Sequence, residues 1–149
     1  MKSFRFLAAA AVPLLLCASF AFAHDDAYLA TQKAPNGGQL RMAGPYHYEL
    51  VAGATASVYV TDHAGTPVPT EGAQGVVHAT GNESSSVKLV PDGENRMKAV
   101  GASTWTNDAT VVVSITFAGV QPAQARFAPQ AAGAPESAQS HSAGVGHKH

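Results

Sequence analysis

The chain has 149 residues, of which 13% are charged, and its formal net charge is −1 at pH 7. That length fits one domain with additional segments. The low charge supplies neither the basic field that nucleic-acid binding requires nor the charge density typical of a disordered chain, so we expect no nucleic-acid partner.

Residues 1–23 have the pattern of a secretory signal peptide: a positively charged start, a short apolar run and a small-residue cleavage pattern ending at Ala23. The apolar run is too short for a membrane anchor, so we expect no membrane span in the mature chain. Cleavage after Ala23, or alternatively after Ala21, predicts export, and a bacterial periplasm fits such a signal. Either cut removes Cys17, the single cysteine, which excludes disulfides and thiolate metal sites.

A mature N-terminal segment, residues 24–33, precedes a predicted β domain at residues 34–128. Val111, Val113, Ile115 and Phe117 alternate with Thr110, Val112, Ser114 and Thr116, and this period of two is typical of half-buried strands. The alternating runs and their turn sequences predict seven or eight short strands and no helix in the mature chain. The expected strands are Gln39–Met42, Tyr46–Val51, Thr55–Asp62, Gly75–Thr80, Ser86–Leu89, Arg96–Ala99, Thr110–Phe117 and Gln121–Phe127.

This pattern predicts an all-β fold, an antiparallel β-sandwich of immunoglobulin-like architecture, with a small barrel as the alternative. For the hairpin around residues 52–54 we expect a three-residue loop. That loop places His47 and Glu49 on one polar strand face, with Tyr59 opposite His47. The face is interpreted either as a partial metal or partner site or as an ordinary polar surface.

Residues 129–149 are poor in aromatic and β-branched residues, which predicts a disordered tail. The tail contains His141, His147 and His149, and three imidazoles on one segment can gather around a metal ion. Ordering such a segment lowers its affinity for the ion, and the alternative is a soluble spacer.

Histidine is abundant for a chain with so few cations, at seven against nine Lys and Arg. Imidazole suits copper, zinc and nickel, and Met42 and Met97 are the available softer ligands. Cleavage after Ala23 makes His24 the first residue, whose amine and ring can chelate one ion. Cleavage after Ala21 makes it the third residue, a position that suits copper(II) or nickel(II). The alternative is that this end is merely solvated.

The remaining two histidines are not expected to bind metal. His63 lies in a predicted turn, where we expect it to be solvated. His78 follows two valines on a predicted strand, where an ordinary satisfied side chain is the favoured interpretation.

A family resemblance is carried by Pro35–Leu40, Ala43–Val51 and Val58–Val68, and by Leu89–Ala99 and Gln124–Phe127, which fit the same pattern. These runs resemble the small β-rich domain of periplasmic adaptor subunits of heavy-metal (RND-type) efflux pumps. They also resemble stand-alone periplasmic proteins built on that domain. The resemblance implies metal handling, and an efflux adaptor or another envelope protein as a partner.

That family often has a histidine before the glycine pair, where this chain has Asn36, so a metal ligand at that turn is not implied. The chain also lacks an adaptor hairpin and a lipoyl-like segment. The resemblance therefore implies a free module of metal handling and not a pump subunit.

No catalytic motif is present in the sequence: it has no G-x-S-x-G elbow, no H-E-x-x-H helix and no phosphate-binding glycine loop. We therefore do not expect an enzyme. The sequence predicts a periplasmic metal-binding accessory protein for copper, zinc or nickel, with candidate ligands His24, His47, Glu49, His141, His147 and His149. The alternative is a metal-free interaction module that docks on an envelope or efflux complex through an edge strand.

Overall fold

The computed structural model describes residues 22–81, 83–106 and 108–129. Eight antiparallel strands and one short helix make up this part, which confirms the predicted all-β fold. The elements are α1 (Phe22–Leu29), β1 (Gln39–Ala43), β2 (Tyr46–Val51), β3 (Ser57–Asp62), β4 (Gln74–Thr80), β5 (Ser84–Pro91), β6 (Arg96–Ala99), β7 (Thr110–Thr116) and β8 (Ala123–Phe127). In the described part, no helix has the length and apolar character needed to cross a membrane.

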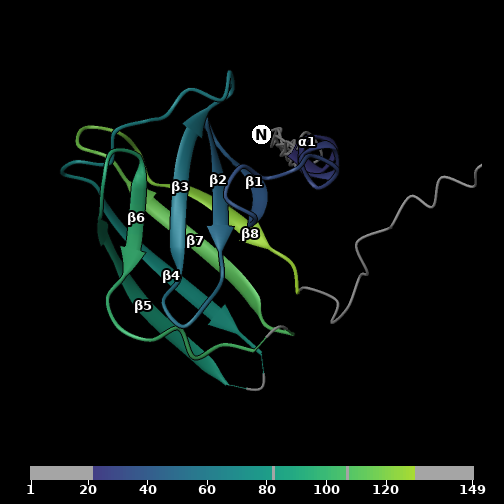
Figure 1. Cartoon of the computed structure of the whole chain (residues 1–149), viewed down its shortest axis with the longest axis vertical. Helices are drawn as coiled ribbons and strands as arrows, with labels where there is room; N and C mark the ends of the chain where they lie inside the picture. The colour runs from purple at the N-terminus through teal and green to yellow at the C-terminus, as the bar shows by residue number, and fades with distance from the viewer. Residues whose placement is uncertain (1–21, 82, 107, 130–149) are drawn as a thin grey trace, which may run out of the picture.

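All eight strands belong to one hydrogen-bonded sheet, with the order β1-β2-β3-β6-β5-β4-β7-β8. The sheet folds over on itself, so that β2 and β3 lie in front of β4 and β7 (Figure 1). Its two end strands, β1 and β8, approach each other, and the sheet is nearly closed. The two halves therefore face each other as in a sandwich, while the hydrogen bonding runs through both.

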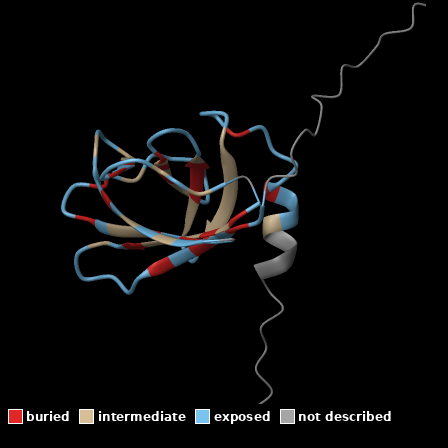
Figure 2. Cartoon of the chain, turned by 90° about the horizontal axis from the view of Figure 1, so that it is seen from below, coloured by how far each residue is buried: buried red, intermediate tan, exposed pale blue. Residues whose placement is uncertain are grey.

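The core lies between these halves and is formed by the inward side chain of every second strand residue. In β7 the buried residues are Val111, Val113 and Ile115, as the alternating sequence predicts. Figure 2 shows buried positions in both halves of the sheet. The hydroxyl of Tyr48 donates to the carbonyl of Ala123 at 3.4 Å and so joins β2 to β8 inside the core. Burial raises the pKa of this hydroxyl above its usual range.

The β2–β3 hairpin differs from the predicted register. Its loop consists of the five residues 52–56, and His47 lies opposite Thr61, while Glu49 lies opposite Tyr59. The prediction that Tyr59 lies across from His47 is therefore wrong by two residues. Because the shift is even, these side chains keep the predicted outer face.

Backbone contacts of the loop explain the longer connection. The N–H of Ala56 donates to Ser103 Oγ at 2.7 Å, and the N–H of Ser103 donates to the carbonyl of Ala54 at 2.9 Å. The carbonyl of Ala56 accepts from Ala99 at 2.9 Å. These bonds to residues 99–103 keep residues 52–56 out of the β2–β3 ladder. The alternation of side chains in the sequence does not indicate such backbone contacts.

The helix α1 corrects the prediction that no helix follows residue 23. The carboxylate of Asp26 accepts a hydrogen bond from the N–H of Met42 in β1 at 2.8 Å, and Leu29 is buried. Contacts with β1 therefore stabilise a segment that is too short to be helical on its own.

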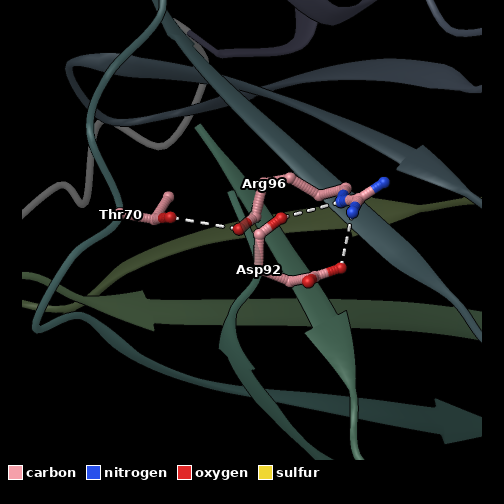
Figure 3. A network of polar contacts seen from close by, with 3 residues as sticks. All are labelled: Thr70, Asp92 and Arg96. Atoms are coloured by element: carbon pink, nitrogen blue, oxygen red, sulfur yellow. Dashed lines mark hydrogen bonds and ion pairs between the residues drawn. The ribbon is translucent and has the colours of Figure 1, made fainter. Parts of the chain in front are cut away.

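Polar contacts around Arg96 join the β5–β6 hairpin to the β3–β4 connection (Figure 3). The guanidinium lies 2.6 Å from the carboxylate of Asp92, and its Nε donates to the carbonyl of Asp92 at 2.9 Å. Thr70, which is fully buried in the connection, donates from its hydroxyl to the carbonyl of Arg96 at 3.0 Å. These contacts hold the β3–β4 connection, which includes His63, Gly65 and Pro67, against the β5–β6 hairpin.

Candidate metal-binding site

A cleft of about 420 Å³ lies over the outer face of β2 and β3. The strands contribute His47, Glu49 and Tyr59 to its lining, and Lys33 and Pro67 come from the connections on either side. The cleft therefore includes both sequence-predicted ligands of β2.

Glu49 is only 3% exposed although it lies on the outer face. One of its carboxylate oxygens accepts from the N–H of Asn36 at 2.7 Å and from the N–H of Gly38 at 3.0 Å. The other oxygen accepts from the side-chain amide of Asn36 at 2.9 Å. The carboxylate thus holds the turn before β1 against the sheet, which is a structural use of a predicted ligand.

His47 has a neighbour that the sequence analysis missed. Its ring stacks on the ring of His63, with centroids 5.0 Å apart and planes 15° from parallel. His63 follows β3 directly and is exposed, as expected for a turn residue. The structure therefore brings together two imidazoles that are 16 positions apart in the sequence.

The turn after β3 positions the His63 ring. One carboxylate oxygen of Asp62 accepts from the N–H groups of Ala64 and Thr66, both at 2.8 Å. The ring Nε2 of His63 lies 3.1 Å from the carbonyl of Gly44 in the β1–β2 turn. A carbonyl only accepts, so Nε2 carries the hydrogen in this contact, and a neutral ring then has its lone pair on Nδ1.

The turn also predicts a pH dependence. Hydrogen bonding by the backbone N–H of Thr66 lowers the pKa of Asp62 below 3.8. Its contribution to folding stability is therefore complete above the unfolded pKa and is lost as the pH falls through the lowered folded value. We expect a carboxyl NMR titration to give a midpoint below 3.8 for Asp62. A midpoint at or above that value contradicts the turn geometry.

Met42, one of the two softer ligands that the sequence offers, lies beside the histidine pair. It lies directly opposite His47 in the β1–β2 register. Their neighbours Ala43 and Tyr48 point into the core, so Met42 and His47 share the outer face. Met97, the other sequence-predicted soft ligand, is fully buried in the core.

The other candidate ligands are not brought to this site. The backbone of His24 lies in α1, and the tail histidines His141, His147 and His149 lie outside the described residues. Over the described ranges, no group of three or more His, Cys, Asp or Glu residues is arranged to hold a metal ion. Two residues of these types, His47 and His63, lie with their rings in contact.

Comparison with protein-family models, curated proteins and solved structures finds no match for the chain. The resemblance to heavy-metal efflux adaptor domains therefore stays a prediction from the sequence runs.

Proposed function

We propose that this protein is a periplasmic metal-binding accessory protein that takes part in the handling or efflux of copper, zinc or nickel. The observation that supports it most is the His47–His63 pair, because imidazole is a preferred ligand of all three ions. The signal-peptide pattern of residues 1–23 supports export, and the family resemblance supports the class of ligand.

The spacing of the two rings is compatible with one shared ion. Metal–nitrogen bonds of about 2.0–2.1 Å allow two ligating nitrogens to lie up to about 4 Å apart. Ring centroids at 5.0 Å are close enough for that separation, but the ring planes are nearly parallel. Because the lone pair of an imidazole nitrogen lies in the plane of its ring, one ring must turn before both nitrogens face the same ion. Histidine ligands usually donate their second ring N–H to a carbonyl or carboxylate, and His63 has such a partner in Gly44.

A metal ion bound by two imidazoles keeps open coordination positions, and such a site suits the transfer of the ion to a partner. Two imidazoles leave room for water or for a ligand supplied by a partner protein, and His63 is exposed to solvent. An ion held in this way can be exchanged, whereas a closed set of four protein ligands is typical of structural sites.

The test is a zinc titration of the full mature chain in which His141, His147 and His149 are replaced by alanine. Histidine-ring NMR signals identify the ligands, and calorimetry gives the affinity. We expect the ring signals of His47 and His63 to shift together, and His47→Ala or His63→Ala to lower the zinc affinity at least tenfold. The matched control is His78→Ala, which removes an exposed histidine from β4 and is expected to leave the affinity unchanged.

The same titration is repeated with copper(II) and nickel(II), whose binding broadens the signals of nearby rings. Ring signals of His47 and His63 that respond to none of the three ions overturn the proposal.

A further inference from the structure

The row of residues across β1, β2 and β3 contains a third candidate ligand, and a second ligand type, beside the histidine pair. Met42 and Thr61 lie directly opposite His47 on its two neighbouring strands. Directly opposed residues in an antiparallel sheet have Cβ atoms about 4.5–5.5 Å apart. A thioether and an imidazole are therefore immediate neighbours on the outer face.

The β1–β2 turn links this row to His63. The carbonyl that meets the His63 ring belongs to Gly44, which follows Met42 by two residues and precedes His47 by three. The register and this contact therefore bring all three residues to one end of the hairpin.

The backbone that carries these side chains is fixed before any ion arrives. The N–H of Met42 is held by Asp26 at 2.8 Å, and His47 lies in a strand paired on both sides. The His63 ring is held through Gly44. The backbone therefore needs little ordering on binding, which favours affinity, and the change required is a reorientation of side chains.

We propose that Met42, His47 and His63 form a copper(I) site. The inference rests on the proposed metal-handling function and narrows it to one ion and one oxidation state. Thioether sulfur is a soft ligand that selects copper(I), whereas imidazole alone suits copper(II), zinc and nickel as well. With Met97 in the core and Cys17 lying inside the predicted signal peptide, Met42 is the ligand that confers the preference.

The test uses Met42→Leu, which keeps a similar apolar volume but removes the sulfur. Copper(I) affinity is measured without oxygen by competition with a coloured copper(I) chelator, again with the three tail histidines replaced by alanine. We expect Met42→Leu to weaken copper(I) binding at least tenfold and to change zinc binding by less than twofold. His78→Ala is the control and is expected to change neither.

A second measurement needs no substitution at residue 42. Copper(I) is diamagnetic, so the methyl NMR signal of Met42 in the otherwise unaltered site is expected to shift when one equivalent is added. The shift is expected to be absent with zinc.

The outcomes separate the two proposals. Unchanged copper(I) affinity in Met42→Leu, or an unmoved Met42 methyl signal, overturns the copper(I) site, while zinc binding by His47 and His63 leaves the proposed function standing. Failure of His47→Ala and His63→Ala to affect any ion overturns both proposals.

Discussion

Gly38→Ala is expected to destabilise the protein by about 3–5 kcal/mol, the largest effect of a single methyl group that the structure predicts. A Cβ at residue 38 would lie 2.4 Å from the carbonyl oxygen of Leu50 and 2.8 Å from its carbonyl carbon. Both are backbone atoms of β2, so only a displacement of the turn relieves the contact. The displacement would also weaken the hydrogen bond from Gly38 to Glu49. Urea unfolding monitored by circular dichroism gives the free energy of unfolding.

Gly37→Ala is the matched control, because the adjacent glycine is needed for a different reason. Its φ is +76°, and a Cβ there would meet nothing within 4 Å. We expect a loss of about 1–2 kcal/mol, the usual cost of a left-handed conformation for a residue with a Cβ. Equal losses for the two substitutions would show that the turn does not lie against β2 as described.

Glu49→Ala is expected to cost about 2–4 kcal/mol in the free energy of unfolding. The substitution removes an almost completely buried carboxylate and leaves three N–H donors of the turn without their acceptor. An unsatisfied buried donor costs the full penalty of its desolvation, which is larger than the net gain from an ordinary hydrogen bond. Urea unfolding measures the loss.

Glu49→Gln distinguishes a structural Glu49 from a metal-binding one. Its amide oxygen can still accept from both backbone N–H groups, and rotation of the Asn36 amide offers an acceptor to the new N–H₂ group. We expect a loss of about 1 kcal/mol in stability and zinc affinity within twofold of the unaltered site. A stable Glu49→Gln protein with zinc affinity lowered tenfold would instead identify Glu49 as a ligand.

The sequence predicts the strands well because each has a solvent face and a core face. The alternation in β7 marks Val111, Val113 and Ile115 as inward-facing, and all three are buried. A period of two fixes the face of a side chain but not its partner, since a shift by two residues preserves every face. The predicted β2–β3 register was therefore wrong, although Tyr48 and His47 lie on the faces that the sequence predicts.

The candidate site was less predictable because contacts distant in the sequence create it. The alternation of side chains in β2 places Glu49 on the solvent face, yet the turn around Asn36 covers its carboxylate. The sequence predicts a solvated turn residue at His63. In the structure its ring contacts the carbonyl of Gly44 in the β1–β2 turn, which is distant in the sequence. The hydrogen bond between Asp26 and β1 likewise joins two segments, and neither sequence pattern predicts that they meet.

The near closure of the sheet has a consequence for chain connectivity. Gln39 at the start of β1 and Phe127 at the end of β8 border the same small surface depression, so the chain enters and leaves the sheet at one place. A linker that joins the end of β8 to the segment before β1 and keeps the turn at Asn36 and Gly38, with a new break in the exposed β5–β6 turn at Gly93, would give a circular permutant with the same strand neighbours. The architecture is thus a property of which strands pair, and the order in which they are synthesised can be changed.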